Sequence, residues 1–189
     1  MSETTLLRMA IDIDGVLADL ISSFLPLMNR HFGRNLEPQD ITRYAFEEVA
    51  QVSAAEMNAF MRSLADSGFY QRLSLLPGAV EALSRLQGRA HLHLITSRPL
   101  ILEAQTRAWL HSHNIPYHQL SFRHRTAKLL PEDHADVVVE DDRDAAAVAA
   151  SLAPRVFLLD YPYNRGGVPL PPHCLRVHNW AEILVHLGL

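Results

Sequence analysis

Short apolar segments recur along the chain, and each ends at polar or turn-forming residues. The first covers residues 6–11 and is followed at once by carboxylates and a glycine. Four similar segments occur later, at residues 91–96, 136–140, 155–160 and 175–178. Short runs of aliphatic and β-branched residues with such endings are typical of strands buried inside a sheet.

Segments with helical spacing alternate with these predicted strands. They cover residues 77–88, 102–113 and 144–152. Strands that alternate with helices predict a parallel sheet covered on both faces, and such sheets bind ligands at the carboxyl ends of their strands. We therefore expect an α/β fold with a Rossmann-like parallel sheet and a site at that edge.

The alternation breaks after the first strand, where a long stretch contains no convincing strand and is too long for a simple connection. Helices are predicted over residues 20–32 and 54–67 instead. Ser53 and Glu56 have the spacing of a capping box at the start of the second helix. This stretch therefore predicts a small helical subdomain.

The length of the chain limits it to one main core. Its 189 residues, of which 48% are hydrophobic, suffice for one globular core with a small insertion but not for a second large domain. We expect residues 1–18 and 77–189 to form the α/β core, and residues 19–76 to form a helical cap.

Charge and composition argue against several classes of function. The formal net charge of -4 disfavours binding to a nucleic acid polymer, which normally requires a basic surface. Cys174 is the only cysteine, so neither an intrachain disulfide nor a thiolate zinc site is expected. No segment has the character of a membrane span or a secretory signal. We expect a cytoplasmic protein that binds a small anionic molecule.

Carboxylates follow two of the predicted strands. Asp12 and Asp14 follow the first strand, and Gly15 permits the chain to turn there. A second acidic run, Glu140-Asp141-Asp142, follows the strand of Val137 to Val139. Mg²⁺ prefers hard oxygen ligands, commonly a few carboxylates together with phosphate oxygens of a substrate. The two runs therefore predict a magnesium site at the edge of the sheet.

Acidic pairs at strand ends are often ordinary turn residues, but the order of four features is more specific. The chain carries Asp12-Ile13-Asp14-Gly15-Val16, then Thr96-Ser97-Arg98, then Lys128, then Glu140-Asp141-Asp142. This order resembles the four motifs of the haloacid dehalogenase superfamily. Within it, the chain is most similar to the 5'(3')-deoxyribonucleotidases and related bacterial nucleotidases. Further similar segments lie at residues 31–42, 76–79 and 161–165.

The resemblance implies roles for the two leading acids. Asp12 is the expected nucleophile, which forms an aspartyl-phosphate. Asp14 is the expected acid and base, which protonates the leaving alcohol and then activates water. Asp12 and the backbone carbonyl of Asp14 are also expected to bind Mg²⁺, with Asp141 or, as the alternative, Asp142.

The resemblance also implies the phosphate contacts. The hydroxyl of Thr96 is expected to hold a phosphate oxygen, with further contacts from Gly15, Ser97 and Arg98. Lys128 is expected to offset charge on the nucleophile and the phosphoryl group. Arg125 is the alternative for the role of Lys128.

The predicted cap is expected to close over the leaving group and to determine specificity. The candidate stacking surfaces for a base are Phe24, Tyr44, Phe46, Phe69 and Tyr70, and Arg43 is the candidate polar contact. Aromatic residues of a small helical subdomain also form its core, and this alternative stays open.

The sequence therefore predicts a Mg²⁺-dependent phosphomonoesterase, with a nucleoside 5'- or 3'-monophosphate as its most specific substrate. One alternative is a phosphatase for another small metabolite, such as a sugar phosphate. Another is a catalytically idle phosphate-binding module, against which the presence of both Asp12 and Asp14 argues. A second copy of the chain, as a homodimer, is the remaining candidate partner.

Overall fold

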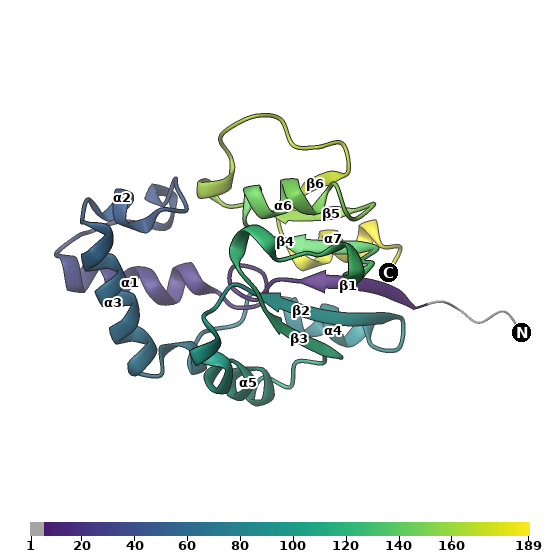
Figure 1. The fold of residues 1–189 in the computed structure, drawn as a ribbon, viewed down its shortest axis with the longest axis horizontal. Helices are drawn as coiled ribbons and strands as arrows, with labels where there is room; N and C mark the ends of the chain where they lie inside the picture. Colours follow the sequence, from purple (N-terminus) through teal and green to yellow (C-terminus); the bar gives the residue numbers. More distant parts are fainter. Residues whose placement is uncertain (1–5) are drawn as a thin grey trace, which may run out of the picture.

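The parallel sheet is the centre of the molecule. The computed structural model describes residues 6–189, apart from the side chain of residue 126. Within this range, six strands form one sheet in the order β3-β2-β1-β4-β5-β6. They are β1 (Leu7–Ile11), β2 (Ala90–Thr96), β3 (Gln119–Phe122), β4 (Val137–Glu140), β5 (Val156–Leu159) and β6 (Cys174–Val177). All neighbouring strands are parallel, which confirms the predicted α/β fold (Figure 1).

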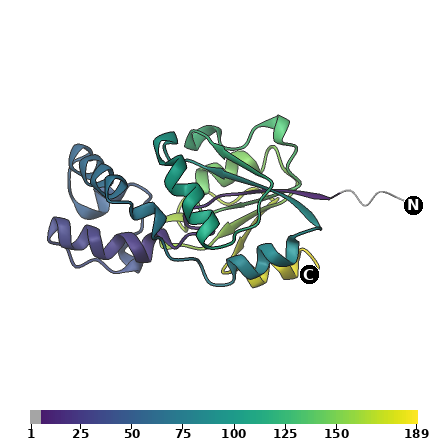
Figure 2. The ribbon, with the colours of Figure 1, turned by 90° about the horizontal axis from the view of Figure 1, so that it is seen from below.

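Helices cover both faces of this sheet. On one face, a hydrophobic core joins the strands to α4 (Ala79–Leu86), α5 (Glu103–Ser112) and α7 (Trp180–His186). Figure 2 shows α4 beside the C-terminal helix α7 on that face. A second core lies between the other face and α6 (Arg143–Ala149). Because both faces of the central strands are buried, these strands read as continuous apolar runs in the sequence.

Among the strands and α-helices, three lie outside the predicted set. β3 is an edge strand that pairs with β2, and its side chains are exposed or half-buried, so it lacks an apolar run. α2 (Phe46–Ala50) and α7 span five and seven residues, too few for helical spacing to stand out. The predicted strands and the longer helices are present, with ends that differ by a few residues.

Helices α1 (Leu20–Phe32), α2 and α3 (Ala54–Asp66) lie beyond the carboxyl ends of the strands (Figures 1 and 2). We call residues 20–66 the helical insertion. α3 begins at the predicted capping box, in which Ser53 Oγ accepts from the Glu56 N–H at 3.2 Å and Glu56 Oε2 accepts from the Ser53 N–H at 2.8 Å. Within residues 6–189, no helix is long and apolar enough to cross a membrane.

An aromatic core holds the helical insertion together. Phe24 is 1% exposed, and its ring lies 5.0 Å from that of Phe46 and 5.7 Å from that of Phe60. The prediction that Phe24 offers a stacking surface to a substrate base is therefore wrong. The side chain points into the insertion because it lies on the buried face of α1, with Leu25 and Met28.

Phe24→Ala is expected to lower the free energy of unfolding by about 3–5 kcal/mol, because it leaves a cavity in this core. Ile101→Ala, which removes a side chain that is 87% exposed, is the control and is expected to change stability by less than about 0.5 kcal/mol. Urea denaturation of the purified variants measures both. A Phe24→Ala variant of unchanged stability would contradict the core assignment.

Candidate active site

The carboxyl end of β1 places Asp12 at the centre of the sheet edge. The Asp12 backbone N–H donates to the carbonyl of Val139 on β4 at 3.0 Å, which fixes the start of the turn that follows. Gly15 adopts a φ of 77°, and its N–H donates to the carbonyl of Ala18 at 2.9 Å. A Cβ atom on Gly15 would overlap the carboxylate of Asp141. Glycine is therefore required both by the backbone conformation and by this close approach.

A buried lysine joins the two acidic runs. Lys128 Nζ lies 2.7 Å from Asp12 Oδ2 and 2.5 Å from Glu140 Oε1. The other oxygen of Glu140 accepts the backbone N–H groups of Asp141, at 2.9 Å, and Asp142, at 3.0 Å. Lys128 thus holds one oxygen of Asp12, while Glu140 fixes the loop that follows β4.

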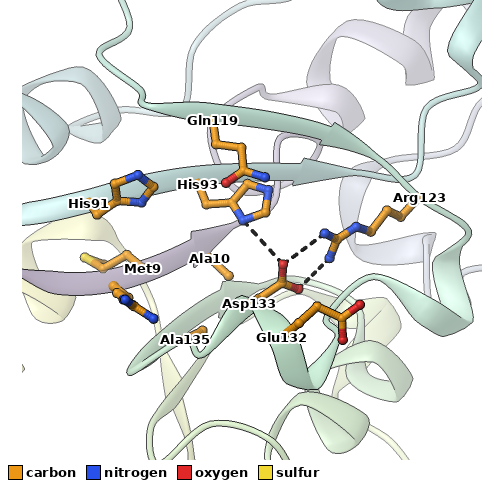
Figure 3. Close-up of a pocket in the computed structure, with 10 residues that line it drawn as sticks. Met9, Ala10, His91, His93, Gln119, Arg123, Glu132, Asp133 and Ala135 are labelled. Carbon is orange, nitrogen blue, oxygen red and sulfur yellow. Dashed lines mark hydrogen bonds and ion pairs between the residues drawn. The ribbon is translucent and has the colours of Figure 1, made fainter.

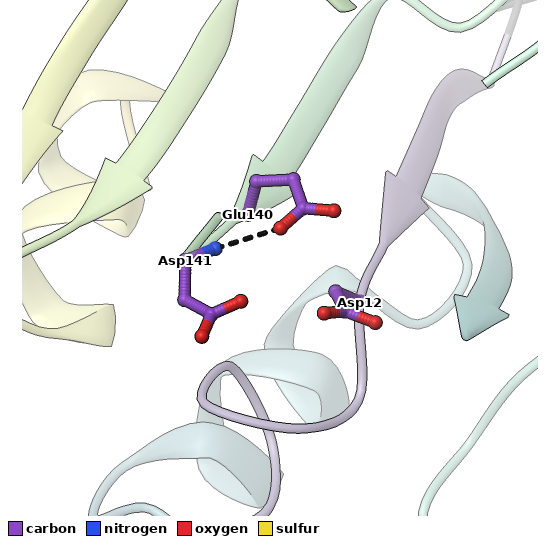
Figure 4. A group of neighbouring side chains, drawn as sticks. All are labelled: Asp12, Glu140 and Asp141. Carbon is purple, nitrogen blue, oxygen red and sulfur yellow. Dashed lines mark hydrogen bonds between the residues drawn. The ribbon is translucent and has the colours of Figure 1, made fainter. Parts of the chain in front are cut away.

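Three buried carboxylates gather beside this lysine: Asp12, Glu140 and Asp141, which we call the acidic group (Figure 4). One oxygen from each lies within 4.8 Å of the others. Among the described residues, Asp12 Oδ1 and Asp141 Oδ1 are buried and have no hydrogen-bond partner. Buried acceptors without partners are costly, and hard oxygen donors so placed suit a divalent cation. The acidic group therefore fits the expected metal.

Asp142, the alternative metal ligand, lies outside this group. Its Oδ1 accepts the N–H of Asp144 at 2.9 Å and that of Ala145 at 3.3 Å, and so caps the first turn of α6. Arg125 pairs with both of its oxygens and also contacts Asp144 at 3.1 Å. Asp141 is thus the carboxylate that faces Asp12. Arg125, the alternative to Lys128, pairs with Asp142 and Asp144 at the start of α6.

Burial and mutual repulsion disturb the proton affinities of these groups. Burial raises the pKa of Asp12 to about 7, an effect that Lys128 partly offsets and Glu140 increases. Burial, Glu140 and Asp12 raise the pKa of Asp141 well above its usual range. Although burial lowers the pKa of Lys128, the attraction of Asp12 and Glu140 outweighs it and raises the pKa overall. One lysine does not neutralise three buried acids, and a cation there would relieve the remaining repulsion.

Asp14 is paired elsewhere. Arg98 binds it through two parallel contacts, Nη2 to Oδ1 at 2.7 Å and Nε to Oδ2 at 2.8 Å, and also contacts Thr106 Oγ1 at 3.1 Å. The guanidinium lies 5.0 Å from the ring of Tyr70 and 5.7 Å from that of Trp109. Arg98 is buried, and each of its three side-chain nitrogens already donates to Asp14 or Thr106, so a phosphate contact from its side chain stays a prediction.

The second predicted motif lies at the same edge of the sheet, because β1 and β2 are parallel neighbours. Thr96 is buried at the end of β2, and its Oγ1 accepts the N–H of Arg98 at 3.2 Å. Ser97 is exposed. Both are placed beside the exit of β1, and their contacts with phosphate also stay predictions.

Arg43, the candidate polar contact, and Tyr44, one of the candidate stacking surfaces, differ in their relation to the site. Arg43 is exposed and pairs with Glu48 at 2.8 Å. Tyr44 lies under the guanidinium of Arg125, at 4.8 Å, and meets the ring of Tyr163 edge to face at 5.7 Å. Burial and the carboxylates of the acidic group raise the pKa of Tyr44 well above its usual range. Tyr44 therefore lies near the predicted metal ligands.

Two tyrosines from the segment after β5 complete the site, and no role is predicted for them from the sequence. The Tyr163 hydroxyl donates to Asp141 Oδ2 at 2.6 Å, and the Tyr161 hydroxyl donates to the carbonyl of Gly15 at 2.9 Å. Their rings stack at 5.0 Å. In the sequence, these tyrosines are marked only by the resemblance of residues 161–165 to the nucleotidases, and this resemblance does not indicate which residues they contact.

A polar hollow of 380 Å³ lies away from the acidic group, over β1, β2 and β3 (Figure 3). Arg123 lines it and pairs with Asp133 at 2.5 and 2.9 Å. Arg123 Nη1 also donates to the backbone carbonyl of Lys128 at 2.8 Å. This pair supports the loop that carries Lys128, although the hollow itself contains none of the acidic group.

A sequence model of the 5' nucleotidase, deoxy (pyrimidine), cytosolic type C family (NT5C) matches residues 6–187. A protein of Halalkalibacterium halodurans with a provisional nucleotidase name is 30% identical over 178 residues, which cover 93% of this chain and 89% of that protein.

Solved structures show the same architecture at lower identity. A haloacid dehalogenase-like hydrolase of Streptococcus pneumoniae is similar with a TM-score of 0.69, 12% identity and coverage of 98% of this chain and 100% of that chain. A haloacid dehalogenase-type hydrolase of Bacillus subtilis, bound to magnesium, is similar with a TM-score of 0.63, 15% identity and coverage of 97% and 99%. At these identities the likeness establishes the fold.

Addition of Mg²⁺ is expected to raise the melting temperature more at pH 8 than at pH 5.5. Because folding raises the pKa of Asp12 to about 7, this carboxyl stabilises the metal-free protein at low pH and loses that contribution as pH rises through about 7. Mg²⁺ competes with the proton of Asp12, so stabilisation of the folded protein by Mg²⁺ increases as pH rises through about 7. At a Mg²⁺ concentration of 100 times the dissociation constant, this stabilisation amounts to about 2.7 kcal/mol. Differential scanning fluorimetry measures it, with Asp141→Asn as the control that should lose most of the effect. A larger Mg²⁺ effect at pH 5.5 would contradict the assignment.

Proposed function

The chain belongs to the 5' nucleotidase, deoxy (pyrimidine), cytosolic type C family of haloacid dehalogenase-type phosphatases, and we propose that it hydrolyses nucleoside 5'- or 3'-monophosphates with Mg²⁺. The observation that carries this proposal is Lys128, which bridges Asp12 and Glu140 beside two buried oxygens without partners. Such a set binds a cation and a phosphate together and leaves one oxygen of Asp12 free to react.

Asp12 is the proposed nucleophile. Lys128 pairs with its Oδ2, and its Oδ1 has no partner among the described residues, so the carboxylate can face a cation with one oxygen and phosphorus with the other. A bond forms between Asp12 and phosphorus while the bond from phosphorus to the alcohol oxygen breaks, and water later cleaves the aspartyl-phosphate to release inorganic phosphate. A bound Mg²⁺ supplies positive charge against the phosphate oxygens. Asp12, Asp141 and the backbone carbonyl of Asp14 are the residues that would hold it, because both oxygens of Glu140 are already engaged.

Asp14 is the proposed acid and base. It gives a proton to the leaving alcohol oxygen in the first step and takes one from water in the second, so its net protonation is restored. In the structure both of its oxygens contact Arg98. The proposed role therefore requires the Asp14 side chain to leave this pair when substrate binds.

The substrate class follows from the surroundings of the acidic group. Lys128, Thr96 and Ser97 are the proposed phosphate contacts. Tyr44 brings an aromatic ring from the helical insertion toward the acidic group, and planar rings suit the face of a nucleobase. The family name points to pyrimidine deoxynucleotides. The helical insertion is thus the proposed cap, which closes over the leaving nucleoside.

Location and assembly stay predictions from the sequence. We propose that the protein is cytoplasmic and does not bind nucleic acid polymers, and a homodimer is one candidate assembly.

Asp12→Asn is expected to lower kcat by about 10³-fold or more, because it removes the nucleophile while keeping its shape. A panel of nucleoside monophosphates and sugar phosphates with Mg²⁺, followed by release of inorganic phosphate, measures activity and preference. Turnover of the wild type without preference for nucleotides would overturn the substrate class alone. Normal turnover by Asp12→Asn would overturn the mechanism.

Asp14→Asn is expected to lower kcat by about 10²–10⁴-fold, the usual contribution of acid and base catalysis. Asparagine keeps an oxygen acceptor for Arg98, so circular dichroism should show a folded protein. The loss should be smaller for aryl phosphates, whose leaving groups need less protonation. Equal losses for alkyl and aryl phosphates would argue against a role for Asp14 in protonating the leaving group.

A further inference from the structure

The side chain of Asp141 accepts a hydrogen bond from Tyr163, which lies in the segment after β5. One of its oxygens has no partner among the described residues, and the other accepts the Tyr163 hydroxyl at 2.6 Å. A carboxylate turns about its own side-chain bonds unless something holds it. The hydroxyl therefore decides which oxygen of Asp141 faces the other carboxylates of the acidic group.

Tyr163 is itself held firmly in place. Its ring stacks on Tyr161 with an interplanar angle of 6°, and the Tyr161 hydroxyl is anchored on the carbonyl of Gly15. The adjacent Asn164 donates from Nδ2 to the backbone carbonyls of Asp141 and Leu159, both at 2.7 Å. The segment after β5 thus forms hydrogen bonds with both the side chain and the backbone of Asp141.

The same ring contacts the helical insertion. Tyr44 meets Tyr163 edge to face, with an interplanar angle of 79°. Tyr44 also packs on Phe46, whose ring belongs to the core of the insertion. A continuous line of contacts therefore runs from the core of the insertion through Tyr44 and Tyr163 to Asp141.

We propose that Tyr163 is a positioning residue that orients Asp141 for a divalent cation and links binding of that cation to docking of the helical insertion through Tyr44. This inference rests on the proposed function only in taking Asp141 as a metal ligand. It assigns no step of the reaction to Tyr163. Partners that orient a metal ligand typically change metal affinity by about 10–100-fold when they are removed.

The test is Mg²⁺ binding to Tyr163→Phe, measured by isothermal titration calorimetry without substrate. The expected result is affinity weakened by about 10-fold or more, with the circular dichroism spectrum of a folded protein in the absence of metal. Tyr161→Phe is the matched control, because it removes the other hydroxyl of the same stacked pair; it is expected to change affinity less than about 3-fold. Equal affinity in Tyr163→Phe and wild type, or equal losses in the two variants, would overturn the proposal.

A double-mutant cycle tests the link to the insertion. Tyr44→Ala alone is expected to weaken Mg²⁺ binding, but to add little to the loss already caused by Tyr163→Phe. Fully additive losses, or no effect of Tyr44→Ala, would overturn the link. Failure of the proposed function is distinguishable, since it would leave a wild type that binds Mg²⁺ but hydrolyses no phosphomonoester.

Discussion

The site depends on the ion pairs that the ammonium group of Lys128 forms with Asp12 and Glu140. Three carboxylates from two strands are buried together, and each would be strongly disfavoured there without a cation. Lys128 contacts two of them and leaves one oxygen of Asp12 and one of Asp141 without a partner among the described residues. The charge of Lys128 therefore stabilises the buried carboxylates only in part and leaves two of their oxygens available to a cation. Burial, together with the repulsion from Glu140, raises the pKa of Asp12 to about 7, and both effects favour a divalent cation bound beside it.

Long-range contacts hold this charged centre rigid. Trp180 Nε1 on α7 donates to the carbonyl of Val16 at 2.8 Å, and the Tyr161 hydroxyl holds the carbonyl of Gly15. Arg123 supports the loop of Lys128 from the side of the polar hollow. The turn after β1 and the loop of Lys128 are thus each supported by residues outside the acidic group. Prearranged charges of this kind are what stabilise a transferring phosphoryl group.

Local patterns in the sequence predict most of the fold and the centre of the site. Apolar runs that end in acids locate β1 and β4, and the parallel sheet brings Asp12 and Asp141 together. The remaining details depend on pairings between distant residues. The sequence around Arg98 shows nothing of its partner Asp14, which lies 84 residues away, and Tyr163 is separated from Asp141 by 22. Asp142 resembles a ligand in sequence, but it caps a helix.

The central claim is that the carboxylate of Asp12 attacks phosphorus beside a cation held by Asp12 and Asp141. The most direct measurement is a crystal structure of the protein with Mg²⁺ and beryllium fluoride, a mimic of a phosphoryl group attached to a carboxylate. The predicted result is beryllium bonded to one carboxylate oxygen of Asp12, with Mg²⁺ in contact with Asp12 and Asp141. Beryllium fluoride bonded to another residue, or Mg²⁺ bound away from Asp141, would contradict it.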